Sequence, residues 1–295
     1  MASVWPGWTF LLATSFLACC LSNMIEWNKM DRRLRQEEST MPAFGPQPLP
    51  RTQRMTIAHE IAERVKERFP LEVFAIGLYG SLAREEDSPY SDIELFGVLR
   101  TDHYKHRYEW CTAEWKAEVD LYGKQTLLER AARVDDRWPL THSALQAVLP
   151  LYDPEQFFVE IGAIARSAPE RLFRETIEEL LVQEVYEGIG KIRNAQVEGL
   201  PSRLPALVLK LAQDVAMIVG LANRHCYTTG TRLIPEAIAL SDLPDGFSEL
   251  GQVILTGDLR DGQQLGATCE RLWQGINLWA QGHGYQFISP ERIPF

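Results

Sequence analysis

The spacing of apolar residues along the chain changes near residue 127, from a mixture of periods to a helical period alone. Before that point, apolar positions three and four residues apart predict a helix over 57–69, and the unbroken apolar run 73–76 predicts a buried strand. Alternation of apolar and polar residues predicts a further strand over 92–98 and a pair of strands within 109–122. The first half of the chain is therefore expected to hold a small sheet.

Helices are expected to fill the rest of the chain, with an interruption at residues 138–142. The segment 171–193 has an apolar stripe at helical spacing, which predicts a long amphipathic helix. The segment 204–221 is apolar nearly all round, which is typical of a helix buried in a bundle or between subunits. A last amphipathic helix is expected over 265–279, so the pattern as a whole predicts an α+β fold.

The first 54 residues differ from the rest and are interpreted as a leader or linker. The apolar stretch 10–21 suits the core of a signal peptide and is too short for an ordinary membrane span, but no Lys or Arg precedes it, which is the wrong charge order for secretion. The proline-rich segment 41–50 is typical of an extended linker. The expected parts are therefore the leader 1–54, a sheet-containing domain over 55–165 and a helical domain over 166–295.

Composition narrows the class of partner. The 295 residues carry a net charge of −10, which argues against a protein that holds long stretches of nucleic acid, because neutralising phosphates needs basic patches. An acidic protein suits a small cationic partner better. The five cysteines show no CxxC pair and no framework spacing, so neither a structural zinc site nor a disulfide scaffold is expected, and reduced cytoplasmic thiols fit best.

The clearest candidate chemistry lies at the turn after the strand predicted over 73–76. Gly80 and Ser81 form this turn, the residues after Ser81 can begin a helix, and backbone N–H groups at such a place attract phosphate. On the next predicted strand, alternation puts Asp92 and Glu94 on one face. Two carboxylates side by side repel each other unless a cation lies between them, so the pair is a candidate Mg²⁺ site beside a phosphate site.

Two further groups of charged residues are candidates on spacing alone. Lys116, Glu118 and Asp120 share one face of a predicted strand, and Glu118 is the candidate third carboxylate that a two-metal site would need. The alternative is a solvated strand face on which Lys116 pairs across strands. Glu187 and Lys191 lie one helical turn apart, and the simplest interpretation is an exposed ion pair worth about 0.3–0.5 kcal/mol.

Gly80-Ser81 followed by Asp92-x-Glu94 resembles the signature of the nucleotidyltransferase superfamily, which has a polymerase-beta-like fold. Further matches from about Met55 to Phe295 narrow this to the kanamycin nucleotidyltransferase family, the aminoglycoside 4'-O-nucleotidyltransferases. They include Trp138-Pro139-Leu140-Thr141-His142, Glu187-Gly188-Ile189-Gly190-Lys191, Cys226-Tyr227-Thr228-Thr229 and Arg292-Ile293-Pro294-Phe295. The resemblance implies a small mixed-sheet nucleotidyltransferase domain followed by a C-terminal helical bundle domain.

The resemblance also implies how a nucleotide would be held. The residues that match the nucleotide-phosphate loop are Gly80, Ser81 and Arg84, and those that match metal or neighbouring active-site carboxylates are Asp92, Glu94 and Glu118. The implied cofactor is Mg²⁺, and the implied co-substrate is ATP or another nucleoside triphosphate.

The remaining implied roles involve the helical half of the chain. Glu187 matches the general base, and Lys191 matches a lysine that reaches the nucleotide phosphates. The acids that match positions facing the aminoglycoside are Glu109, Glu118 and Glu184. Members of the family are homodimers, in which each active site joins the N-terminal domain of one subunit to the helical domain of the other.

The implied activity is transfer of AMP, or another nucleoside monophosphate, to the 4'-hydroxyl of aminoglycoside antibiotics, with release of pyrophosphate and resistance as the outcome. One alternative is an enzyme of the same fold that nucleotidylates a protein or RNA, which the acidic charge and the later motifs oppose. Another is a nucleotide-binding interaction module, which the intact carboxylates Asp92, Glu94, Glu118 and Glu187 oppose. The expected partners are an aminoglycoside and a nucleoside triphosphate, with no nucleic acid, in the cytoplasm.

Overall fold

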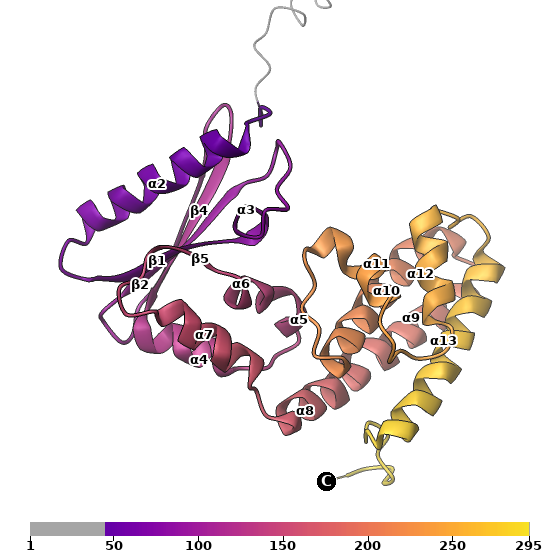
Figure 1. Ribbon diagram of the computed structural model, residues 1–295. Coiled ribbons are helices and arrows are strands. Elements are labelled where there is room, and N and C mark those ends of the chain that lie inside the picture. Colours follow the sequence, from indigo (N-terminus) through magenta and orange to yellow (C-terminus); the bar gives the residue numbers. More distant parts are fainter. Residues whose placement is uncertain (1–44, 295) are drawn as a thin grey trace, which may run out of the picture. The chain divides into compact units, whose positions relative to one another are not determined.

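The structure, a computed structural model, describes residues 45–294 (Figure 1). Residues Pro48–Cys111 and Trp115–Phe295 belong to one compact unit, and residues Met1–Gln47 with Thr112–Glu114 belong to another. The apolar stretch and most of the expected leader lie outside the described residues. The fold below is that of the first unit.

Five strands form one mixed sheet in the order β3-β4-β2-β1-β5. They are β1 (Val73–Tyr79), β2 (Ile93–Leu99), β3 (Lys105–Cys111), β4 (Lys116–Gly123) and β5 (Leu149–Tyr152). Strands β2 and β4 are parallel, with Glu94 beside Glu118, whereas the other neighbours are antiparallel. The expected α+β fold with a small mixed sheet is confirmed, and the two acidic strands lie side by side.

Helices cover both faces of this sheet (Figure 1). On one face lies α2 (Arg51–Arg68), whose Ile61 and Val65 share a core with Leu95. On the other face lie α4 (Lys124–Ala132), α6 (Ser143–Gln146) and α7 (Phe157–Arg166), which share a core with Phe96. Burial on both faces explains why β1 is an unbroken apolar run and not an alternating one.

One element of this half differs from the sequence-based expectation, and another, the expected helix after Ser81, is short. Strand β5 lies where only helix is expected, because it is a four-residue, mostly exposed edge strand whose partner β1 is distant in sequence. The helix after the Gly-Ser turn, α3 (Gly80–Ala83), is one turn long. For β5, pairing with a distant strand overrides the local sequence signal. For α3, the turn at Arg84 ends the helix.

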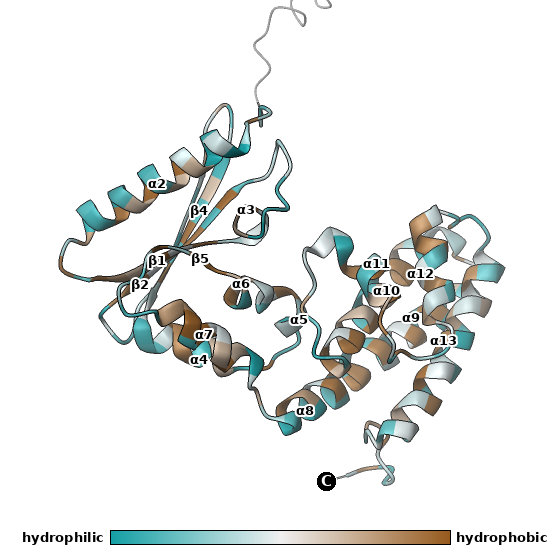
Figure 2. Cartoon of the chain, viewed as in Figure 1, coloured by the Kyte–Doolittle hydropathy of each residue, from teal (hydrophilic) through white to brown (hydrophobic). Residues whose placement is uncertain are grey.

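The C-terminal half is helical, as expected. Its elements are α5 (Trp138–Thr141), α8 (Glu170–Leu180), the π-helix η1 (Leu181–Tyr186), α9 (Glu187–Val197), η2 (Pro201–Arg203), α10 (Leu204–Ala222), η3 (Gly230–Arg232), α11 (Leu233–Ala237), α12 (Phe247–Thr256) and α13 (Gly262–His283). Among the described residues, one helical stretch, Pro201–Ala222, is long and apolar enough to span a membrane. It is the core helix of this half, since Val208, Leu211 and Val215 are buried against the surrounding helices (Figure 2).

The long helix expected over 171–193 is an unbroken helical stretch made of α8, η1 and α9. Its buried stripe continues through Ile177, Leu181, Val185 and Ile189. The π-helical turn directly before Glu187 widens the helix locally, a feature that is frequent at functional sites and that helical spacing alone does not predict.

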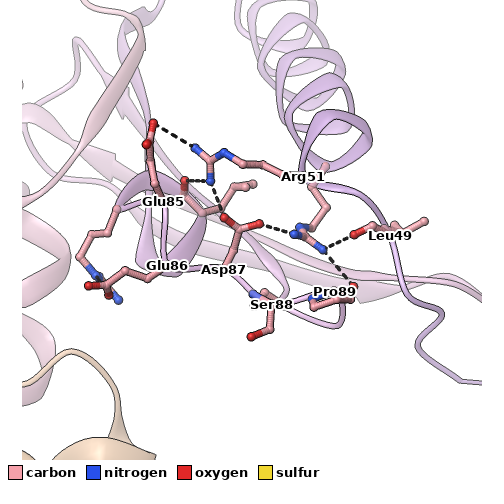
Figure 3. Close-up of polar contacts among 11 residues, drawn as sticks. Leu49, Arg51, Glu85, Glu86, Asp87, Ser88 and Pro89 are labelled. Carbon is pink, nitrogen blue, oxygen red and sulfur yellow. Dashed lines mark hydrogen bonds and ion pairs between the residues drawn. The ribbon is translucent and has the colours of Figure 1, made fainter.

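A buried ion pair fastens the segment after α3 to the start of α2 (Figure 3). Arg54 is 2% exposed, pairs with Asp87, and donates to the carbonyl oxygens of Leu49 at 2.5 Å and Pro89 at 2.9 Å. Arg51 also pairs with Asp87. Both arginines precede Met55, the expected start of the domain, so the folded region includes residues that the sequence assigned to the leader.

The charge of Asp87 is held in place by these two arginines. Burial alone would raise the pKa of Asp87, but hydrogen bonds from Arg54 and Arg51 hold that pKa below its ordinary value. Because the pKa is depressed in the folded state, the resulting stabilisation is present above the unfolded-state pKa and is lost as the pH falls through the folded-state pKa.

We expect Asp87→Asn to lower the free energy of unfolding at neutral pH by about 3–5 kcal/mol, because it leaves a buried guanidinium without its counter-charge. The loss should shrink in acid, where Asp87 itself is protonated. Urea denaturation measures both effects. The control is Glu67→Gln, which removes the exposed partner of Arg64 and should cost less than about 0.5 kcal/mol. Equal losses in the two variants would contradict the assignment.

Candidate active site

The turn after β1 and the acidic strands β2 and β4 face one cavity of about 570 Å³. Among the residues that line it are all those expected to hold nucleotide or metal in the first half of the chain, which are Gly80, Ser81, Arg84, Asp92, Glu94 and Glu118. The helical half contributes Thr228–Arg232 to the wall. Arg84 Nη2 donates to the carbonyl oxygen of Thr228 at 3.0 Å, so this arginine joins the turn to that segment.

Only glycine fits at position 80. Its φ is +73°, in the left-handed region, and a Cβ there would lie 1.7 Å from Oε2 of Glu94. The missing side chain lets the turn approach the acidic strand directly. The backbone of the turn therefore lies directly against the Glu94 carboxylate.

Like charges are concentrated at Glu94. Burial, followed by the charges of Asp92 and Glu118, raises the pKa of Glu94 to about 7. Lys116 offsets part of this charge from the rim, with its Nζ 3.4 Å from Asp92 Oδ2 and 2.8 Å from Glu109 Oε1. The negative charge of the carboxylates is therefore only partly neutralised by the protein. Lys116 does pair with acids on or beside neighbouring strands, as the alternative interpretation of the sequence expected.

Further polar side chains lie next to Glu118 on β1, β3 and β4. Tyr79 donates its hydroxyl hydrogen to Glu118, and Arg107 donates to both oxygens of Asp120, from Nε at 2.6 Å and Nη2 at 2.8 Å. Burial and the charge of Asp120 raise the pKa of Tyr79, so the phenol stays protonated and remains a donor. Sequence reasoning placed Asp120 on this face but did not select it. Its pairing with Arg107 depends on the alignment of β3 with β4, which the local spacing of residues does not predict.

Three acids and a lysine with expected roles do not line the cavity within the described chain. Glu187 Oε1 pairs with Lys191 Nζ at 2.7 Å on an exposed face of α9, which is the simple i,i+4 pair that spacing predicts. Glu184 pairs with Lys210 at 2.7 Å on the same side of the bundle. Glu109 lies outside the cavity wall, at Lys116. The cavity of the single chain is therefore not lined by these four side chains.

The residues present fit a hard divalent cation in their chemistry. Among residues 45–294, no three His, Cys, Asp or Glu side chains already converge on one metal position. Asp92 and Glu94 nevertheless supply oxygen ligands to the same cavity, and their mutual repulsion is the kind that a bound cation relieves. Mg²⁺ commonly takes one or two protein carboxylates and completes its shell with water and substrate phosphates.

Comparison with known proteins gives matches over both halves of the chain. The family model described as nucleotidyltransferase domain matches residues 58–137, and the one described as KNTase C-terminal domain matches residues 155–286. Two curated proteins named aminoglycoside nucleotidyltransferase (4'), from Staphylococcus aureus and from a Bacillus species, are each 41% identical over 251 residues, which is 85% of this chain and 99% of theirs. A solved nucleotidyltransferase-like protein from Exiguobacterium sibiricum aligns with a TM-score of 0.49 and 12% identity, over 80% of this chain and 81% of that one.

Cation binding at Asp92 and Glu94 should stabilise the folded chain, because a ligand that binds only the folded state adds to the free energy of unfolding. Mg²⁺ at a hundred times its Kd should add about 2.7 kcal/mol, and Asp92→Asn should lose most of this gain. Thermal melting with and without Mg²⁺ measures it.

The matched control is Asp102→Asn, which removes the same charge from an exposed position outside the cavity. It should keep the Mg²⁺-dependent rise in melting temperature. Equal rises in the Asp92 and Asp102 variants would show that the cation binds elsewhere.

Proposed function

This chain belongs to the aminoglycoside nucleotidyltransferase (4') family, and on that basis we propose that it transfers AMP, or another nucleoside monophosphate, to the 4'-hydroxyl of aminoglycoside antibiotics. The reaction would use Mg²⁺ and release pyrophosphate. The observation that carries the proposal is the cavity in which the Gly80-Ser81 turn meets Asp92 and Glu94.

The proposed binding of the nucleotide follows from the charges around the turn. Backbone N–H groups at Gly80 and Ser81 suit a phosphate, and Arg84 lies in the same wall with a side chain that can donate to it. Asp92 and Glu94 would hold Mg²⁺, which when bound supplies positive charge beside the phosphates. Glu118, fixed by the Tyr79 hydroxyl, keeps the opposite wall acidic.

The proposed binding of the aminoglycoside follows from the acidic remainder of the cavity. Aminoglycosides carry several ammonium groups, and carboxylates both attract such a substrate and orient it. Glu118 lines the cavity. Glu109 lies beside it at Lys116, and Glu184 would approach from another subunit.

We assign the general base to Glu187 and phosphate contact to Lys191, in a homodimer with shared sites. Both side chains are more than half exposed and lie outside the cavity of their own chain. The hydrogen bond from Lys191 holds the pKa of Glu187 below its ordinary value, so this carboxylate is ionised at neutral pH and can accept the proton of a sugar hydroxyl. The π-helical turn that precedes Glu187 supports a functional role for this face.

The cytoplasm is the proposed location, and antibiotic resistance is the proposed outcome. A nucleoside triphosphate is available there as co-substrate, and Cys111, Cys226 and Cys269 carry free thiols. Modification inside the cell would inactivate the drug where it acts.

Incubation of the full chain with ATP, Mg²⁺ and a panel of aminoglycosides, followed by mass spectrometry, tests the proposed activity. We expect each drug that has a 4'-hydroxyl to gain the mass of one AMP unit, and a matched analogue without that hydroxyl to gain none. No adduct on any drug would contradict the proposed activity, and an adduct on the analogue would contradict the assigned hydroxyl.

The shared site predicts complementation between two inactive variants. Asp92→Asn should abolish transfer, and Glu187→Gln should slow the chemical step by about 10²–10⁴ while leaving substrate binding largely unchanged. Equal mixing with free subunit exchange should restore roughly a quarter of the original activity, because half the dimers are mixed and each of those has one intact site. If labelled subunits exchange and activity stays absent, Glu187 does not act in the partner's site.

A further inference from the structure

A second cavity, of about 530 Å³, lies beside the candidate active site. Its wall is built by β3, β4, α4 and the segment that leads into α5. Arg107, Asp120, Arg130 and Thr141 line both cavities, so the two adjoin at these side chains. We call this second space the basic cavity.

Cationic side chains dominate the wall of the basic cavity, although the chain as a whole is acidic. They are Lys105, Arg107, Arg130, Arg133 and Arg137. Within the described residues, Arg107 is the one member of this set that is paired with carboxylates, those of Asp120 and Glu118. Arg130 donates instead to the neutral hydroxyl of Tyr122. Four of these five side chains therefore make no ion pair within the described residues.

The three carboxylates in the same wall offset only part of this charge, because five cationic side chains face three anionic ones. Asp120 is committed to Arg107. Asp135 accepts from the backbone N–H of Arg137 at 3.1 Å, and Glu129 accepts from the side chain of Gln125 at 3.2 Å. Like charges gathered around one concave space repel one another, and a bound polyanion relieves that repulsion while it accepts charge-assisted hydrogen bonds.

We propose that the basic cavity binds a small phosphate-type polyanion. Its proposed occupant is the pyrophosphate released in the adjoining candidate active site. The identification of the anion as released pyrophosphate rests on the proposed function, but the ability of the cavity to bind such an anion does not. Arginine matches phosphate oxygens with two donors at once, which suits a diphosphate better than a single-charged anion. Arg130 lines both cavities and makes no ion pair with any described residue, so it offers the anion positive charge where the two cavities adjoin.

Direct binding tests the proposal without reference to catalysis. The full chain is titrated with pyrophosphate in metal-free buffer by calorimetry, so that no divalent cation can bridge the ligand to Asp92 or Glu94. The test variant is Arg133→Gln with Arg137→Gln. The control variant is Arg64→Gln with Arg171→Gln, which removes the same charge from exposed positions outside the cavity. Lys105→Gln provides an independent single change in the same wall.

We expect the wild-type chain to bind pyrophosphate, the test variant to bind it about tenfold or more weakly, and the control variant to match the wild type. Lys105→Gln should weaken binding in the same direction. Absence of binding by the wild type, or equal affinities in the test and control variants, overturns the site.

A parallel titration with orthophosphate distinguishes a site for pyrophosphate, the reaction product, from a site for free phosphate. Tighter binding of pyrophosphate supports a site for the reaction product, and equal or tighter binding of orthophosphate overturns that identity. Because no transfer is measured, a chain that binds pyrophosphate but modifies no aminoglycoside would contradict the proposed function alone.

Discussion

The carboxylates of Asp92, Glu94 and Glu118 face one cavity although their charges repel one another. The cost is visible at Glu94, whose pKa burial and these neighbours raise to about 7. Such a group is half protonated near neutral pH unless a cation joins it. The pairing of the strands and the turn after β1 hold these three side chains in the wall of one cavity.

Several separate devices keep this arrangement in place. Parallel pairing of β2 with β4 sets Glu94 beside Glu118, and Gly80 lets the turn come against Glu94 without a clash. The Arg54–Asp87 pair anchors the chain between that turn and β2. Tyr79 fixes Glu118 by a hydrogen bond, so the acidic wall keeps its shape before any ligand binds.

Local sequence pattern was sufficient for the features that depend on neighbours along the chain. Alternation predicted that Asp92 and Glu94 share a face, and helical spacing predicted the buried stripe that includes Ile177 and Ile189. The partnership of Arg107 with Asp120 was not predictable in this way, because it depends on which strands pair. The role assigned to Glu187 came from the family resemblance, since its spacing to Lys191 indicates only the surface ion pair that the structure contains.

We propose that the acidic strands form a cation site, which the protein side chains alone leave incomplete. The titration of Glu94, followed by carbon-13 NMR of its side-chain carboxyl group, tests it most directly. We predict a pKa near 7 without divalent cations, from burial and like charge, and a value well below that with saturating Mg²⁺. An ordinary glutamate pKa that Mg²⁺ does not change would contradict the proposed cation site at Glu94.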